Sequence, residues 1–171
     1  MTENMEIRRA AAPEDIAAIA ALAHQIWNEY FPPIIGQEQV DYMLEKLQSA
    51  PAITRQIESG YEYYLVTVGG EPAAYFALAP PAGGGAIQLS KFYVKAEHRG
   101  GGLGKAIMDF AGRRCREFGA STIWLTVNRH NAGPITFYER LGFRRDGELV
   151  QDIGGGFVMD DYKMVKDLAD E

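Results

Sequence analysis

The sequence predicts an α+β fold in which helices flank a mixed central sheet. Strand-like and helix-like segments follow the order β-α-α-β-β-β-α-β-α-β-β, which differs from the strict alternation of a doubly wound fold. The length of 171 residues suits a single domain that spans residues 1–171. Because 47% of the residues are hydrophobic, such a domain can bury a sizeable core.

The first half of the chain carries the signals of a strand, several helices and a hairpin. Apolar residues recur at helical spacing from Pro13 to Tyr30, and the pair Pro32-Pro33 ends that helix. Two further helical segments and a β-hairpin around Gly69-Gly70 follow. The expected elements are a strand over 5–10, helices from 13, over 37–48 and over 52–59, and hairpin strands over 61–68 and 71–79.

The second half begins after the glycine triplet at 83–85, which separates the hairpin from the next strand. Residues 87–94 alternate and are rich in β formers, whereas Leu103, Ile107 and Phe110 recur at helical spacing. The expected elements are strands over 87–94 and 122–127, helices over 102–118 and 132–141, and two closing strands around Gly154-Gly155-Gly156.

Between this strand and helix lies the loop from Arg99 to Lys105, in which four of the five positions 100–104 are glycine. Glycine permits positive φ angles and leaves the main-chain amides open to a ligand. Those amides, together with the positive end of the following helix, favour an anionic group. The loop therefore predicts a phosphate site, and a glycine-rich connection without a ligand is the alternative.

Spacing excludes two nucleotide-binding motifs for this loop. A Walker A loop needs glycine at position 99 and serine or threonine at 106, but Arg99 and Ala106 stand there. A dinucleotide fingerprint that starts at either candidate glycine would place its third glycine on Lys105 or Ile107. The pattern that remains is R-x-x-G-x-G, which runs from Arg99 to Gly104.

A second motif lies between Asn131 and Phe143, with asparagine at a helix start, proline in the first turn and glycine at the end. Together with the loop, this N-x-x-P-x-x-F-Y-x-x-x-G-F segment resembles the GNAT superfamily of N-acetyltransferases. The resemblance covers about residues 5–165. It implies the GNAT fold, whose mixed, mostly antiparallel sheet splays between the strands that end at Val94 and Val127 to hold acetyl-CoA.

The resemblance also implies acetyl-CoA as co-substrate, no metal, and roles for individual residues. Tyr138 matches the family tyrosine that reaches the CoA sulfur and acts as general acid, although a half-buried aromatic on an amphipathic helix is the alternative. Asn131 matches an asparagine that contacts the cofactor, and it is also a plain N-cap candidate. The implied cofactor-binding residues are Phe92, Tyr93, Val94, Arg99, Gly100, Gly101, Gly102, Leu103, Gly104, Lys105, Asn131 and Tyr138.

The acceptor is indicated by the uneven distribution of charge. Residues 1–85 carry a net charge of −7, residues 86–146 carry +6, and residues 147–171 carry −5. The acidic parts favour a cationic acceptor, or else they are ordinary solvated surface. Segments 89–94 and 152–164 resemble bacterial polyamine N-acetyltransferases of the PaiA type. The candidate acceptor-binding residues are Trp27, Glu29, Tyr30, Asp160 and Asp161, and the candidate general bases are Glu29, Ser90, Asp160 and Asp161.

Other features narrow the class of protein. No apolar run is long enough to cross a membrane and the acidic start shows no secretory signal, so we expect a cytoplasmic protein. The lone Cys115 excludes an internal disulfide, and the scattered histidines lack metal-ligand spacing. An overall charge of −6 without a recognition-helix pattern argues against nucleic acid binding.

The expected partners are therefore acetyl-CoA and a small amine, and a homodimer is left open because members of the family are often dimeric. Two kinds of alternative remain. The acceptor is a peptide or protein amine or an aminoglycoside in the first, and the chain is a non-catalytic acyl-CoA sensor in the second.

Overall fold

The computed structural model describes residues 4–168, so both ends of the expected 1–171 domain lie outside the described residues. The expected elements all occur. The strands are β1 (Met5–Arg9), β2 (Glu62–Val68), β3 (Glu71–Leu78), β4 (Ala86–Val94), β5 (Thr122–Asn128), β6 (Arg144–Gly154) and β7 (Phe157–Asp167). The helices are α1 (Pro13–Tyr30), α2 (Pro32–Ile35), α3 (Gln37–Leu47), α4 (Ala50–Glu58), α5 (Leu103–Glu117) and α6 (Ala132–Arg140), with a 3-10 turn η1 (Ala96–His98).

The helical region after α1 differs from the expectation in two respects. Pro32-Pro33 ends α1 but also starts the short helix α2, because the fixed φ of proline suits a first helical turn, where its missing N–H is not needed. Helix α4 begins earlier than expected, since the Ser49 side chain accepts a hydrogen bond from the Ala52 amide at 3.3 Å.

No helix within residues 4–168 is both long and apolar enough to cross a membrane.

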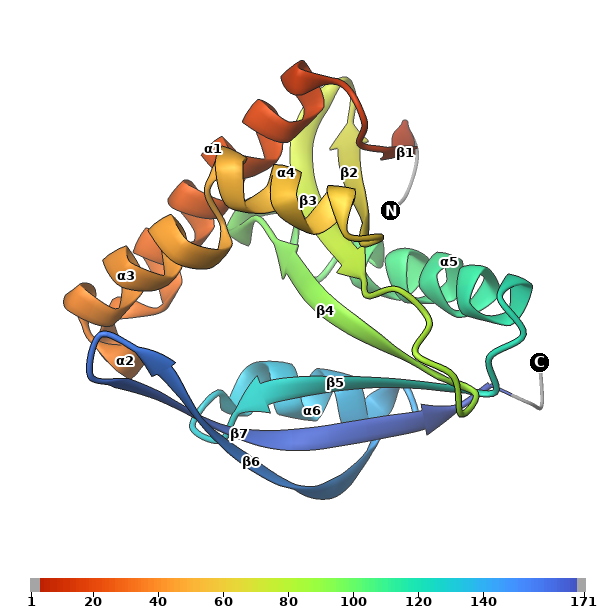
Figure 1. Cartoon of the computed structure of the whole chain (residues 1–171). Coiled ribbons are helices and arrows are strands. Elements are labelled where there is room, and N and C mark those ends of the chain that lie inside the picture. The colour runs from red at the N-terminus through yellow and green to blue at the C-terminus, as the bar shows by residue number, and fades with distance from the viewer. Residues whose placement is uncertain (1–3, 169–171) are drawn as a thin grey trace.

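The strands form one seven-stranded sheet in the order β1-β2-β3-β4-β5-β7-β6. Neighbouring strands pair antiparallel, except that β4 and β5 are parallel. Figure 1 shows two arms, with β1 to β4 in one and β5, β7 and β6 in the other. The arms meet where β4 begins and open toward α2 and α3.

The opening results from the short contact between β4 and β5. These strands pair at Ala86–Gln88 with Thr122–Trp124 and then diverge (Figure 1). In β4 the register shifts around Ser90, and such a bulge increases the local twist of a strand. The splayed sheet that the family resemblance implies is therefore present, at the expected pair of strands.

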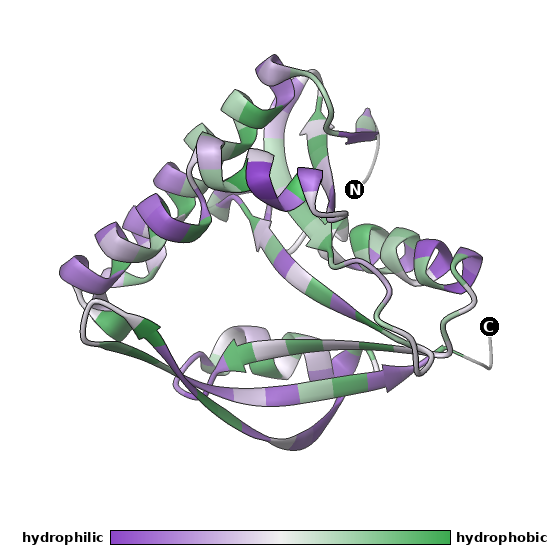
Figure 2. Cartoon of the chain, in the orientation of Figure 1, coloured by the Kyte–Doolittle hydropathy of each residue, from purple (hydrophilic) through white to green (hydrophobic). Residues whose placement is uncertain are grey.

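Helices cover both faces of the first arm and give it two hydrophobic clusters. Residues of β3 alternate between them, because successive side chains of a strand point to opposite faces. Tyr75 packs with residues of α1, α3 and α4, whereas Phe76 packs with residues of α5 and α6. In Figure 2 the surface helices carry hydrophilic residues on their outer sides and hydrophobic residues toward the sheet. The two layers hold β4 rigidly at the edge of the opening.

Candidate active site

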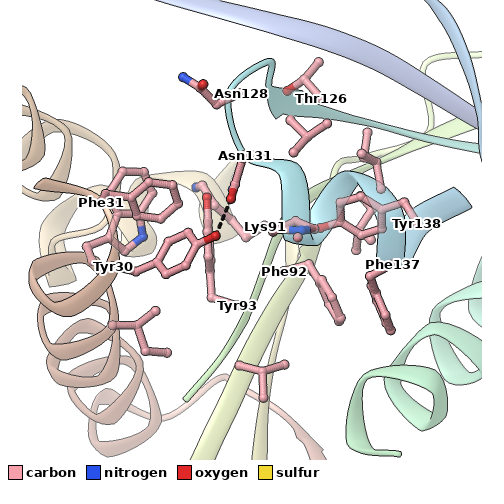
Figure 3. Close-up of a pocket in the computed structure, with 18 of the residues that line it drawn as sticks. Tyr30, Phe31, Lys91, Phe92, Tyr93, Thr126, Asn128, Asn131, Phe137 and Tyr138 are labelled. Carbon is pink, nitrogen blue, oxygen red and sulfur yellow. Dashed lines mark hydrogen bonds between the residues drawn. The ribbon is translucent and has the colours of Figure 1, made fainter. Parts of the chain in front are cut away.

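A cavity of about 690 Å³ occupies the space between the two arms of the sheet. Its walls are the diverging parts of β4 and β5 (residues 89–94 and 125–128), helices α1 and α3, the start of α6, and the loop before α5. Figure 3 shows side chains from these distant segments converging on one space. The sequence motifs that were predicted to share a ligand therefore border a common site.

The glycine loop presents its backbone to this cavity. Gly100 has a φ of 82°, and Gly102, which is the N-cap of α5, has a φ of 86°. A Cβ built on either glycine would meet no atom within 4 Å, so the backbone conformation requires glycine there, while packing inside the protein does not. Of the predicted loop residues, Arg99, Gly100, Gly102, Gly104 and Lys105 border the cavity.

Two of the predicted loop residues do not border the cavity. A third, Gly104, was predicted to bind the cofactor, but it is also required for helix packing. Leu103 is buried in the core and Gly101 lies on the exposed surface of the loop. Gly104 is required by packing, because a Cβ there would lie 2.8 Å from Cζ of Phe137. The ring of Phe137 stacks on Phe92 at a centroid distance of 5.9 Å. The missing side chain at Gly104 therefore allows α5 to pack closely against the Phe137 ring of α6.

Asn131 stands at the start of α6 but does not make the expected capping bond. Its side-chain oxygen instead accepts a hydrogen bond from the hydroxyl of Tyr30, which links α1 to α6 (Figure 3). The turn before α6 is held by the Asn128 side chain, which accepts a hydrogen bond from the His130 amide at 2.9 Å. The N-cap prediction for Asn131 is thus wrong as far as its side chain is concerned, since a tertiary partner has taken that oxygen.

Tyr30 also contacts the glycine loop. The Arg99 guanidinium lies 5.1 Å from the centre of the Tyr30 ring, and its Nε donates a hydrogen bond to the carbonyl oxygen of Val94 at 3.0 Å. Tyr30, predicted as an acceptor-binding residue, therefore lies between two predicted cofactor-binding residues, Arg99 and Asn131. It thus lies where the predicted cofactor and acceptor regions adjoin.

Tyr138 lies in the last turn of α6 and borders the cavity. It is 7% exposed and its ring lies 6.0 Å from that of Phe92 and 5.7 Å from that of Phe143. Burial raises the pKa of its hydroxyl well above the usual value for tyrosine. The phenol therefore stays protonated at neutral pH.

The structure separates the two neighbouring aspartates of β7. Asp161 is 4% exposed and borders the cavity. Burial raises its pKa to about 6, with a further contribution from the Asp160 carboxylate, while Thr126 and Arg129 act in the opposite direction. Asp160 forms an ion pair with Arg129 at 2.7 Å, and its side chain is 44% exposed. Because alternate residues of a strand face opposite sides, Asp160 does not line the cavity and its predicted acceptor role is not supported.

On α1, helical periodicity separates two of the predicted acceptor-binding residues. Trp27 borders the cavity and packs on Phe31 and Tyr93, with centroid distances of 4.3 and 5.4 Å. Glu29 is exposed and accepts a hydrogen bond from Gln25 at 3.2 Å, away from the cavity lining. Two residues along a helix turn the side chain through roughly 200°, which places Glu29 on the opposite face.

The sequence reasoning missed Lys91, which also borders the cavity. Its ammonium donates hydrogen bonds to the Tyr63 hydroxyl at 2.9 Å, to Oε1 of Gln56 at 3.2 Å and to the Leu47 carbonyl at 3.5 Å. Burial lowers the pKa of Lys91 to about 8. The available signal was a lysine in the middle of a run of strand-forming residues, because lysine in such a run is buried only rarely and then with polar partners.

Ser90, a candidate general base, also borders the cavity, and its hydroxyl is buried. A serine hydroxyl accepts a proton poorly unless a base lies beside it. Within residues 4–168 no group of three or more histidine, cysteine, aspartate or glutamate side chains has the arrangement of a metal site. Of the four candidate bases, Asp161 alone combines burial, a carboxylate and a place on the cavity wall.

The glycine loop before α5 and the buried Tyr138 border one cavity in an opened sheet, as the resemblance to the N-acetyltransferases implies. The chain belongs to the Acetyltransferase (GNAT) family, whose model matches residues 20–143.

Individual relatives agree with this assignment. An uncharacterized N-acetyltransferase of Lactobacillus delbrueckii subsp. lactis is 26% identical over 151 residues, which cover 82% of this chain and 86% of the relative. N-acetyltransferase 8 of Rattus norvegicus is 29% identical over 132 residues. The match covers 77% of this chain and 57% of the rat protein, so the chain spans little more than half of that relative.

Solved structures share the fold. The PaiA N-acetyltransferase of Thermoplasma acidophilum, in complex with coenzyme A, superimposes with a TM-score of 0.78 at 21% identity, covering 95% of this chain and 98% of that one. The family and fold predictions are thereby confirmed. The chain is an acyltransferase, and its co-substrate is acetyl-CoA, as in the rest of the family.

Proposed function

We propose that the chain transfers the acetyl group of acetyl-CoA to a primary amine by direct attack in a ternary complex. One observation carries the proposal: Tyr138 and Asp161 border the same cavity and hold opposite protonation states at neutral pH. The tyrosine keeps its proton, whereas the aspartate, with a pKa of about 6, has lost its own. Such a pair supplies the acid and the base of one reaction.

The proton transfers follow from these states. Asp161 takes a proton from the bound ammonium group, directly or through a water molecule, and the neutral nitrogen attacks the thioester carbonyl. A C–N bond forms, and the tetrahedral intermediate then breaks its C–S bond. Tyr138 donates its proton to the leaving thiolate, and the second proton of the nitrogen restores the phenol. The products are the N-acetylated amine and the free thiol of CoA, and Asp161 releases its proton to the solvent.

We assign the cofactor to the wall formed by the glycine loop and the diverging part of β4. The amides around Gly100 and Gly102 would hold the pyrophosphate, supported by their positive φ angles and their position at the start of α5. The pantetheine arm would pair with the exposed main chain of residues 92–94, like an added strand. Support for this comes from the early divergence of β5, which leaves that edge of β4 open.

For the acceptor we propose a polyamine, or another small cationic amine. The proposal is supported by the fold similarity to the PaiA N-acetyltransferase, by the acidic flanks of the sequence and by Asp161, the one carboxylate among the described cavity-lining residues. A cytoplasmic location, a homodimer and a single domain for residues 1–171 stay predictions.

An acceptor screen tests the proposal. Release of the CoA thiol is measured with acetyl-CoA and, in turn, polyamines, diamines, lysine peptides and aminoglycosides. We expect the highest kcat/KM with a polyamine. A higher value with lysine peptides or aminoglycosides would overturn the acceptor class. If acetyl-CoA binds but none of the amines causes thiol release, the result would support the sensor alternative.

A further inference from the structure

Helix α3 forms one wall of the proposed acceptor part of the cavity. Gln39, Met43 and Leu47 lie on one face of this helix and all border the cavity. At one end, the Gln39 side chain donates a hydrogen bond to the carbonyl of Val158, beside the β6–β7 turn, at 3.2 Å. At the other, the Leu47 carbonyl accepts the bond from Lys91. Eight residues of helix separate these ends by about 12 Å.

Two charged side chains divide this length. Met159 borders the cavity near the Gln39 end, and Asp161 lies two residues further along the same face of β7, about 7 Å inward. Lys91 closes the Leu47 end. The chamber therefore has an outer end at Gln39, a carboxylate part of the way along, and an ammonium at its inner end.

The positive charge of Lys91 is not neutralised by the protein around it. All three of its hydrogen-bond acceptors are uncharged, and no carboxylate within residues 4–168 forms an ion pair with it. The ring of Tyr63, 5.5 Å away, adds another neutral contact. Burial lowers the pKa of Lys91, but the value of about 8 leaves most of the molecules charged at pH 7. In surroundings of low polarity such a charge acts strongly on a ligand.

We infer that Lys91 is a specificity-determining residue: its ammonium keeps a second positive charge out of the inner end of the chamber and admits a neutral or anionic group there. This inference rests on the proposed acetyl transfer and refines its acceptor. A polyamine would present one terminal amine to Asp161, with its other ammonium groups directed to the outer end. A short diamine, whose second ammonium stays inside the chamber, would be a poor acceptor.

Three acceptors of similar length that differ in their far end test this inference. They are 1,4-diaminobutane, pentylamine and 4-aminobutanoate, whose far ends are cationic, neutral and anionic. We measure kcat/KM for each with the wild-type protein and with Lys91→Met and Lys91→Gln, the latter retaining a hydrogen-bond donor without the charge. In both variants the ratio of the 4-aminobutanoate value to the 1,4-diaminobutane value should fall at least tenfold, while pentylamine changes less than threefold.

Lys163→Met is the matched control. Lys163 lies two residues from Asp161 on β7 but outside the cavity lining, 4.9 Å from the Trp124 ring. Its removal should shift the ratio less than twofold. An unchanged ratio in the Lys91 variants, with acetyl transfer to pentylamine intact, overturns the specificity role and leaves the proposed function standing. Failure of the wild-type protein to acetylate any amine overturns the proposed function itself.

Discussion

The two halves of the cavity are built in different ways. The proposed cofactor wall is made mostly of backbone, from a continuous glycine loop and the edge of one strand. The proposed acceptor chamber is made of side chains from α1, α3, β4 and β7, which are far apart in the chain. A backbone site needs a local conformation that glycines can provide, whereas a side-chain site depends on which face of each element points inward. The following changes test this difference, beginning with the position where the two halves meet.

The largest loss of turnover is expected from Tyr138→Phe, which removes the proton donor and keeps the ring. We expect kcat to fall about 100- to 1,000-fold, in the range of general acid catalysis, and the Kd of acetyl-CoA to change less than twofold. Steady-state kinetics and calorimetry measure the two effects. Tyr162→Phe, on the other face of β7 beside Arg129 and Arg145, serves as the control and should retain full activity. A Tyr138→Phe enzyme within threefold of wild type would exclude Tyr138 as the acid.

Asp161→Asn should lower kcat about 100-fold, because it removes the base and leaves the shape of the chamber unchanged. The pH profile sharpens this test. In the wild type kcat should fall below a pH of about 6, where the carboxylate takes up its proton, and this limb should be absent from the variant's residual activity. A limb that persists in Asp161→Asn would assign the titration to another group.

The same substitution separates catalysis from stability. The folded pKa of Asp161 lies above its ordinary value of 3.8, so charging the buried carboxylate costs stability as pH rises from about 4 to about 6, and the full cost is present above that range. Replacing it with asparagine should increase the free energy of unfolding at pH 8 by about 3 kcal/mol, and most of the gain should be lost near pH 4. Urea unfolding at both pH values measures this. A variant that is inactive and less stable would point to a structural role.

On the cofactor side, Gly102→Ala should weaken acetyl-CoA binding about tenfold, because a Cβ at this position projects into the space assigned to the pyrophosphate. Gly70, in the β2–β3 turn, has the same φ of 86° and equally open surroundings, so Gly70→Ala is a matched control. Both variants should lose about 1–2 kcal/mol of stability, since alanine is strained at positive φ. If calorimetry finds equal acetyl-CoA affinities for the two variants, the assignment of the pyrophosphate to the glycine loop is wrong.

The smallest effects are expected from Glu29→Gln and Asp160→Asn, the two acidic candidates that the structure places outside the cavity lining. Each should change kcat/KM for a polyamine less than twofold at 0.15 M salt, where exposed charges are screened. A tenfold loss in either variant would indicate that the acceptor site reaches the outer surface. The site would then include residues outside the cavity lining.

The sequence predicted the two halves of the cavity to different extents, for the same reason. The strands, helices and glycine loop were predicted because periodicity and glycine spacing are local properties. The acceptor residues were only partly predicted: Trp27 and Asp161 border the cavity, whereas Glu29 and Asp160 do not. One residue along a strand, or two along a helix, turns a side chain to the opposite face. Proximity in sequence does not reveal which face points inward.

By itself, the sequence determined the α+β fold, the glycine loop from Arg99 to Gly104 and the resemblance that led to acetyl-CoA, because each depends on residues within a short segment. Only the tertiary structure decided that the Asn131 side chain binds Tyr30 instead of a backbone amide of its own helix, and that Asp161 faces the cavity. It also decided that Lys91 carries an unneutralised charge at the inner end of the acceptor chamber. Burial and partners across a cavity are properties of the packed chain, and they set the charge states on which the proposed chemistry depends.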